Sequence, residues 1–182
     1  MIEISYHSMV IFISVLWILT RIFCFLHYKR FSPMRELQLL LVYICIIVVV
    51  RFTFCPFGKV DGKILPLLFD PANILPFRFN WIPFVNLLDY EILSEARLNI
   101  IGNTAMFIPI GIIWPLVFRQ LNTPVRVMAA GVGFSLCIEI LQLPFFDRVT
   151  DIDDLILNSL GFLTGYLIYL LFRSVKQKIQ GA

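Results

Sequence analysis

Five segments of the chain are apolar over about the 20 residues that a helix needs to cross a bilayer. Their apolar runs are continuous and do not alternate, which is typical of helices and not of membrane β-strands. Backbone groups in lipid also have to pair within their own segment, which favours helices. The predicted spans are residues 8–27, 37–57, 98–118, 125–144 and 154–172. The pattern predicts an all-α membrane protein with about five transmembrane helices.

The composition agrees with a membrane location. The chain is 59% hydrophobic and 15% charged, whereas a soluble domain is nearer to half apolar and a quarter charged. Small domains leave much of their surface exposed, so the excess apolar surface has to face lipid. The net charge of +3 comes mainly from Lys and Arg between the apolar runs, which indicates membrane topology and not nucleic-acid binding. The four cysteines form no CxxC pair, so they indicate packing and not a metal site.

The distribution of basic residues predicts the orientation. If the N-terminus lies outside, the short cytoplasmic segments carry most of the Lys and Arg, as the positive-inside rule requires. These bases are Lys29, Arg30, Arg35, Arg119, Arg126, Arg173, Lys176 and Lys178. This N-out, C-in arrangement needs an odd number of spans, which supports five. The chain then divides into an N-terminal anchor helix with a cytoplasmic loop (residues 1–36), a transmembrane domain (37–173) and a basic cytoplasmic tail (174–182).

The outer segment at residues 58–97 is too polar and too rich in proline for a simple span. It contains the similar pentapeptides NILPF (73–77) and NWIPF (80–84), and its prolines interrupt regular helix. Aromatic rings settle at the membrane–water boundary, so this aromatic and proline-rich segment is predicted to lie on the outer interface or to dip into it. An ordinary loop packed on the helix ends is the alternative. The polar stretch 89–97 is predicted to form a short surface helix before the third span.

Polar residues recur at helical spacing near the outer ends of the last three spans. The pairs are Asn99 with Asn103, Glu139 with Gln142, and Asp154 with Asn158. Each pair is three or four residues apart and so shares one helix face. An ionisable residue within a span is costly and usually faces the bundle interior or a water-filled cavity, which makes Glu139 the most informative position. Gly161 and Gly165 continue the face of the fifth span and would let another helix approach closely.

We therefore predict that the three helices bring these six side chains together with Arg148 and Asp151 in a polar pocket. In the functional interpretation, the candidate catalytic groups are Glu139 and Asp154, and the candidate ligand-binding residues are Asn99, Asn103, Gln142, Arg148, Asp151 and Asn158. In the structural interpretation, the same groups join helices by hydrogen bonds that contribute about 0.6 kcal/mol each on average. Glu139 with Arg148 could then be a structural ion pair.

These residues also carry a resemblance to a known family. The stretches NIIGNTAMFIPIGI, SLCIEILQL and DRVTDIDDLILNSLGFLTGY resemble the VanZ-like membrane protein family, and NWIPF resembles an earlier signature of that family. The matching positions are Gly102, Asn103, Phe107, Pro109, Gly111, Glu139, Gln142, Arg148, Asp151, Asp153, Asp154, Asn158, Gly161 and Gly165. The resemblance covers about residues 40–172. It implies a multi-pass protein of the bacterial cell membrane, and an association with low-level resistance to teicoplanin-type glycopeptide antibiotics.

Several functions fit these observations. The first is an envelope protein that binds or modifies a lipid-linked cell-wall precursor or another glycopeptide-related envelope component. Arg148 would then meet phosphate, and Glu139 could act as a general base. The second is metal-assisted chemistry, because Asp151, Asp153 and Asp154 with Glu139 offer the oxygen ligands that Mg²⁺ or Ca²⁺ prefers.

The third candidate is a non-catalytic scaffold or assembly partner. Transport is a fourth, for which a dimer or other homo-oligomer could supply the missing spans. The expected partners are membrane lipids, and no pattern in the sequence indicates a cofactor or a nucleic acid.

Overall fold

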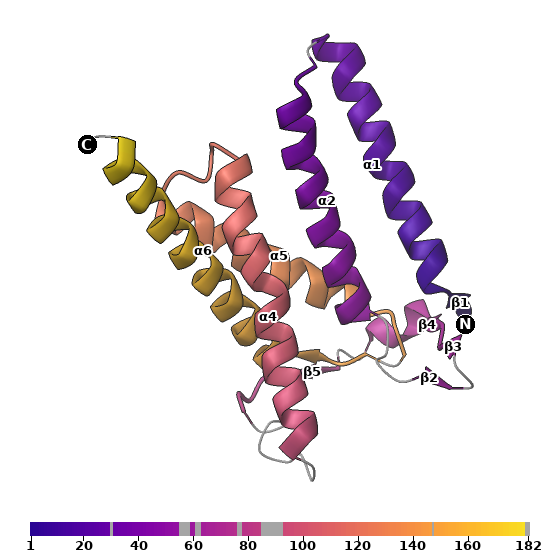
Figure 1. Ribbon diagram of the computed structural model, residues 1–182. Helices are drawn as coiled ribbons and strands as arrows, with labels where there is room; N and C mark the ends of the chain where they lie inside the picture. The colour runs from indigo at the N-terminus through magenta and orange to yellow at the C-terminus, as the bar shows by residue number, and fades with distance from the viewer. Residues whose placement is uncertain are drawn as a thin grey trace.

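A computed structural model of the protein describes residues 1–29, 31–54, 59–60, 63–75, 78–84, 93–146 and 148–180. The long helices are α1 (Tyr6–Tyr28), α2 (Pro33–Phe54), α4 (Leu93–Val117), α5 (Pro124–Gln142) and α6 (Ile152–Gln180) (Figure 1). Within the described residues, five helices are long and apolar enough to cross a membrane. The predicted all-α membrane fold with about five spans is therefore confirmed, while the N-out, C-in orientation stays a prediction.

The helices begin where local chemistry allows it. The Ser5 side chain accepts a hydrogen bond from the backbone N–H of Ser8 at 3.1 Å and so caps α1. Thr123 caps α5 in the same way, and Pro124 takes the first helical position, where proline loses no hydrogen bond. Capping side chains satisfy N–H groups that have no partner within the helix. Membrane spans as well as soluble helices benefit, because unpaired N–H groups are costly near lipid.

Helix α1 lies beside α2, on the side of α2 that is away from the other helices (Figure 1), and it has no buried residues. Two polar contacts join the pair. The hydroxyl groups of Ser14 and Tyr43 are 2.6 Å apart. The guanidinium of Arg21 donates to both carboxylate oxygens of Glu36, at 2.9 Å and 2.5 Å. Arg21 and Glu36 therefore neutralise each other within the apolar surface of the two helices, as charged groups in membranes usually do.

Helices α4 and α6 cross in close contact because glycines lie between them. A Cβ atom at Gly161 would overlap the carbonyl oxygen of Thr104, and one at Gly165 would overlap that of Ile108. On α4, a Cβ atom at Gly111 would overlap the carbonyl oxygen of Phe162. The predicted close approach of a neighbouring helix at Gly161 and Gly165 is therefore confirmed. Small residues at such crossings let two backbones make van der Waals contact over a long stretch.

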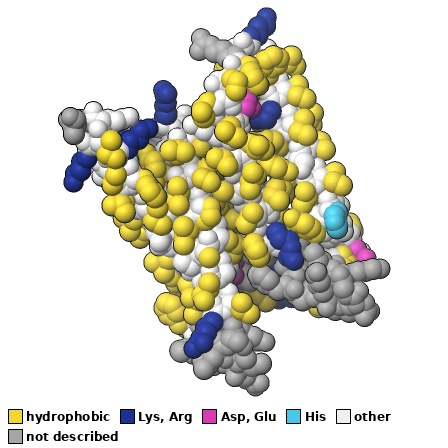
Figure 2. Space-filling model, in the orientation of Figure 1, with side chains coloured by type: hydrophobic (Ala, Val, Ile, Leu, Met, Phe, Trp, Pro, Cys, Tyr) yellow, Lys and Arg dark blue, Asp and Glu magenta, His cyan; other side chains and the backbone are white. Residues whose placement is uncertain are grey.

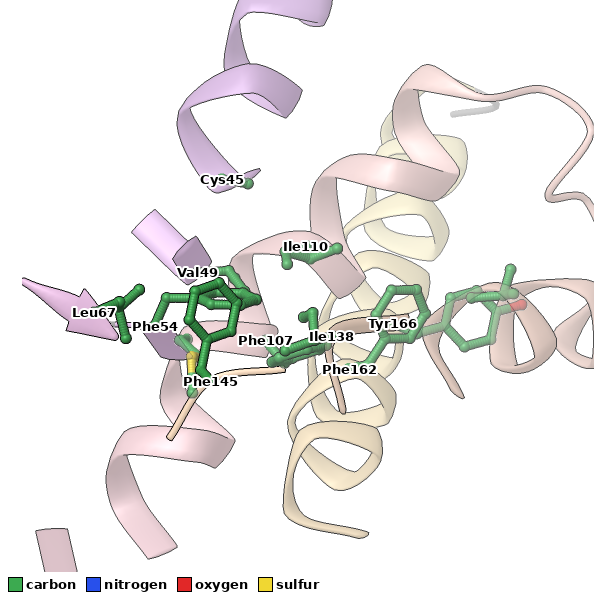
Figure 3. Packing of buried hydrophobic residues seen from close by; sticks show 12 residues of the cluster. Cys45, Val49, Phe54, Leu67, Phe107, Ile110, Ile138, Phe145, Phe162 and Tyr166 are labelled. Carbon is green, nitrogen blue, oxygen red and sulfur yellow. The ribbon is translucent and has the colours of Figure 1, made fainter. Parts of the chain in front are cut away.

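The buried hydrophobic core joins four of the long helices and their connections (Figure 3). Val49 and Phe54 of α2 pack toward Phe145, which follows α5, and the rings of Phe54 and Phe145 meet edge to face at 5.7 Å. Phe107 of α4 and Phe162 of α6 are fully buried. The Phe162 ring also fills the space beside Gly131 of α5. Aromatic side chains thus hold α2, α4, α5 and α6 together.

The described strands are short and lie at the end of the helices where α1, α4 and α6 begin (Figure 1). Strand β1 (Ile2–Ile4) pairs antiparallel with β4 (Leu67–Phe69), and β2 (Lys59–Val60) pairs with β3 (Lys63–Ile64). A 3-10 helix, η1, covers Pro71–Ile74. Strand β5 (Phe79–Asn80) runs parallel to β6 (Thr150–Asp151), which directly precedes α6. These pairings fix the connections over the same end of the helices.

The two largest differences from the predicted helix boundaries are at the end of α6 and at the start of α4. Helix α6 continues to Gln180, eight residues past the predicted end of the span. Residues 173–180 contain no glycine or proline, so the helix extends beyond the apolar stretch. The predicted surface helix at 89–97 lies partly outside the described residues, and from Leu93 the chain already belongs to α4. The interfacial position of segment 58–97 stays a prediction, although Trp81 and Ile82 are exposed at that end.

The surface shown in Figure 2 is mainly hydrophobic along the lengths of the helices. Most of the Lys and Arg side chains visible there lie toward the two ends. On helix α1, for example, the side chains of Ile11, Phe12, Phe23 and Leu26 are each more than half exposed. An apolar band between charged ends is what a helical membrane protein presents to lipid.

Replacing Gly161 by leucine is expected to separate α4 from α6, because the added side chain would overlap the α4 backbone. Overpacking of this kind costs about 1–3 kcal/mol, so membrane abundance and the thermal unfolding temperature in detergent should both fall. Gly133→Leu is the matched control, since a Cβ atom at Gly133 would meet nothing within 4 Å. Equal unfolding temperatures for the two variants would contradict the close crossing.

Candidate functional site

A polar pocket of about 450 Å³ lies among α2, α4, α5, α6 and the segment before β6. Seven of the eight predicted site residues line it. They are Asn99, Asn103, Glu139, Gln142, Arg148, Asp154 and Asn158, together with Phe52, Thr53, Leu98, Gly102, Met106 and Val149. Three helix faces that the sequence placed separately therefore meet at one cavity. Their roles in binding or catalysis remain predictions.

Glu139 faces the interior of the bundle and is only 2% exposed. It lies on the last turn of α5, and its Oε2 accepts a hydrogen bond from the backbone N–H of Asp151 at 3.2 Å. The backbone oxygen of Glu139 accepts from the Thr150 hydroxyl at 3.1 Å. Strand β6 thus closes over the end of α5 and gives the buried carboxylate a polar partner. This position agrees with the rule that acids within spans avoid lipid.

Asp154 is the second carboxylate of the pocket and is half-buried on the first turn of α6. Its Oδ1 accepts a hydrogen bond from the side-chain amide of Asn103 on α4. The same Asn103 amide donates to Oδ1 of Asn99 at 3.2 Å. The carboxylate also gains from its place near the positive end of the α6 dipole. Asn103 therefore links the polar faces of α4 and α6.

Two further side chains join α5 to its neighbours. Asn158 of α6 donates to the Ser135 hydroxyl of α5 at 3.0 Å, and Gln142 of α5 donates to the backbone oxygen of Thr53 in α2 at 2.6 Å. Asn158 is 1% exposed, and among the described residues its Oδ1 has no hydrogen-bond partner. Buried amide oxygens usually have one. Asn158 belongs to the pocket wall, but this oxygen is itself buried and is not exposed to the cavity.

Asp151 and Asp153 make contacts that hold the connection between α5 and α6, and they do not line the pocket. Both oxygens of Asp151 lie 3.4 Å from the side-chain amide of Asn80, and Oδ1 also accepts from the backbone N–H of Asp153 at 2.9 Å. Asp153 accepts from the backbone N–H of Phe84 at 2.8 Å. Phe84 has a positive φ of 67°, which this contact helps to hold. The NWIPF element thus anchors the start of α6, and the backbone N–H of Asp151 contacts the pocket carboxylate of Glu139.

The charges in the pocket set what it can bind. Glu139 and Asp154 supply two carboxylates, and Arg148 supplies a guanidinium whose charge acts on Asp154. The four side-chain amides add donors and acceptors. Such a mixture suits an uncharged or mixed-charge polar ligand with hydroxyl and amide groups, and Arg148 suits an attached phosphate. Glu139 and Asp154 are also positioned to exchange protons with a group in the pocket.

A metal ion would have to use a different ligand set from the predicted one. Asp151 and Asp153 are engaged by Asn80 and by the backbone at Phe84. In the part of the chain that the structure describes, no group of three His, Cys, Asp or Glu residues is arranged to hold a metal. Glu139 and Asp154 are the carboxylates that face one cavity, so a divalent cation would depend on them and on amide oxygens.

Two residues outside the predicted set of site residues help to build the site. Thr53 brings α2 to the pocket through its backbone oxygen, which accepts from Gln142. The sequence gives little indication of this role for Thr53, because a single threonine at the end of an apolar run is common. Asn80 holds Asp151, and the NWIPF motif did mark its position. Its partner could not be inferred, since the β5–β6 pairing joins residues that are 71 positions apart.

A comparison with protein families supports the resemblance seen in the motifs. The family model described as VanZ/LLP1 matches residues 40–173, which is most of the chain. The match begins within α2, so α1 precedes it, and all seven pocket-lining site residues fall inside it. No curated protein and no solved structure matches the chain significantly.

The bond between Asn103 and Asp154 is expected to stabilise the fold and can be measured with a double-mutant cycle. Asn103→Ala, Asp154→Ala and the double variant should show a coupling free energy of unfolding of about 0.6 kcal/mol, with about 1.7 kcal/mol as the upper range for such bonds in membranes. The control pair is Asn122 and Arg126, whose exposed side chains are 3.0 Å apart on the surface. Coupling no larger than that of the exposed pair would refute a packing role for the α4–α6 contact.

Proposed function

The chain belongs to the VanZ/LLP1 family, and from this premise we propose that it binds a lipid-linked cell-wall component of the bacterial membrane. The polar pocket holds the headgroup, on the outer side of the bilayer. Holding or modifying this component lowers the access of teicoplanin-type glycopeptides to the wall. The observation that carries the proposal is a buried carboxylate, Glu139, that shares one cavity with amides from three helices.

The chemistry of a wall precursor matches the pocket. A polyprenyl-linked sugar phosphate presents hydroxyl and acetamido groups, which hydrogen-bond to carboxylates and amides such as Asp154 and Asn158. Its phosphate suits the guanidinium of Arg148. If the headgroup is modified as well as bound, Glu139 and Asp154 are the groups that move protons.

A scaffold function is the second candidate, and specific contacts favour it. Asn103 with Asp154, Asn158 with Ser135, and Gln142 with Thr53 each join two helices. These bonds would be present in a protein whose polar cluster only specifies packing. Substitution of Glu139 distinguishes the two functions best, because the Glu139 carboxylate is bonded to the backbone of β6 and not to another helix. The metal-assisted alternative requires a cation between Glu139 and Asp154.

Glu139→Gln is expected to lose function without losing the protein. The amide keeps an acceptor for the Asp151 N–H, so membrane abundance should stay within about twofold of the wild type, since the net worth of such a bond is only about 1 kcal/mol. The amount of polyprenyl-linked lipid that copurifies, measured by mass spectrometry, should fall about tenfold. Teicoplanin susceptibility of cells that express the variant should rise.

Glu3→Gln provides the control, because Glu3 is exposed in β1 at the same end of the helices. A loss of abundance that parallels the loss of lipid would favour the scaffold. Lipid retention that depends on added Mg²⁺ and disappears on Asp154→Asn would favour the metal-assisted alternative.

The proposed orientation can be tested in intact cells with a membrane-impermeant maleimide. In a variant without the native cysteines, Val149→Cys lies beside the pocket and is exposed, and Asn122→Cys is exposed at the opposite end of α5. We expect labelling at position 149 and none at 122 until the cells are opened. The reverse pattern would place the pocket on the cytoplasmic side and exclude contact with externally facing wall precursors.

A further inference from the structure

A second cavity, of about 620 Å³, lies between α2 and α4 beside the polar pocket. Apart from Arg97, its walls are apolar and include Val48 of α2 and Ile101, Ala105 and Pro109 of α4. The groove is open on the side that faces lipid, since Ile101 is 64% exposed. The groove is therefore much more apolar than the pocket next to it.

The two cavities adjoin each other. Phe52, Leu98, Gly102 and Met106 line both of them. At this shared wall, a Cβ atom on Gly102 would meet nothing within 4 Å, so no atom crowds the glycine there. The adjoining cavities suit a single molecule that has one polar part and one hydrocarbon part.

The groove follows α4 from Leu98 to Pro109. At 1.5 Å per residue, this is about 16 Å along the helix axis, or about half of the 30 Å hydrocarbon layer. Within the described residues, one apolar groove shares its walls with the polar pocket. It offers room for one chain, which fits a polyprenyl phosphate better than a glycerophospholipid with two acyl chains. Arg97 lies next to Leu98, where the phosphate would join the chain.

We propose that the groove between α2 and α4 binds the first part of the polyprenyl chain of the lipid whose headgroup is held in the polar pocket. This inference rests on the proposed function and adds the route of entry. The lipid moves sideways from the membrane between α2 and α4, with its chain remaining in the hydrocarbon layer. The headgroup then reaches Asn103 and Asp154 without crossing the apolar surface.

Ala105→Phe tests the groove separately from the pocket, because Ala105 lines the groove alone. The protein is placed in nanodiscs and given two probes. One is a polyprenyl diphosphate linked to N-acetylglucosamine, with a photoreactive diazirine on the chain. The other is the water-soluble methyl diphosphate of the same sugar. We expect Ala105→Phe to lower the affinity for the long-chain probe about tenfold or more. The affinity for the soluble probe should change by less than about twofold.

The matched control is Ala129→Phe, at an exposed position of α5 that lines neither cavity. It should leave both probes unaffected. Irradiation of the wild type should label residues of α2 and α4 at the groove, such as Val48 and Ile101. Labelling confined to α1 or α5 would overturn the proposal, as would unchanged long-chain binding in Ala105→Phe.

The outcomes also separate this inference from the proposed function. If Glu139→Gln loses the soluble probe while Ala105→Phe binds the long-chain probe fully, the headgroup site in the pocket is supported and the chain site in the groove is refuted. If labelling of α2 and α4 does not change in Glu139→Gln, the chain site is supported and the headgroup site is refuted. A diacyl glycerophospholipid that competes as strongly as the polyprenyl lipid would overturn the assignment of the chain.

Discussion

The cost of placing carboxylates within a hydrocarbon layer governs the arrangement of this protein. Glu139 and Asp154 belong to helices that are otherwise apolar enough to span a membrane, and a charged group facing lipid there is unfavourable by several kcal/mol. The fold turns both toward one cavity and gives each a hydrogen bond. The rest of the structure, from the α4–α6 crossing to the strands at one end, keeps these two side chains away from lipid.

In the proposed function, the hydrogen bonds that pack the helices would also take part in recognition, which would limit how the site can vary. Asn103 brings α6 to α4 through Asp154, and Gln142 brings α5 to α2. A ligand that competes for these amides also loosens a helix contact, so the two uses are energetically coupled. Glu139 escapes this conflict because its partner is the backbone of β6. Ligand binding there can change a connection without separating helices.

Helical periodicity was sufficient to predict the spans and the three polar faces. Spacings of three and four residues placed Asn99 with Asn103 and Asp154 with Asn158, and the glycine spacing predicted the crossing at Gly161 and Gly165. Periodicity could not predict that Asp151 lies outside the pocket. The backbone of Asp151 lies beside Glu139 because β6 folds back over α5, while the side chain of Asp151 contacts Asn80. Strand pairs of two residues have too little sequence pattern to be recognised.

Helix α1 explains why the groove between α2 and α4 stays open to lipid. It packs on the side of α2 that faces away from α4 (Figure 1). Its contacts with α2 include the polar pairs Ser14–Tyr43 and Arg21–Glu36 and the rings of Trp17 and Tyr43. These contacts hold α1 where it does not cover Val48 and Phe52 on the other face of α2. The family match begins after α1, so the pocket and the groove both lie within the matched region. In the proposed function, α1 in this position would leave the entrance between α2 and α4 accessible from lipid.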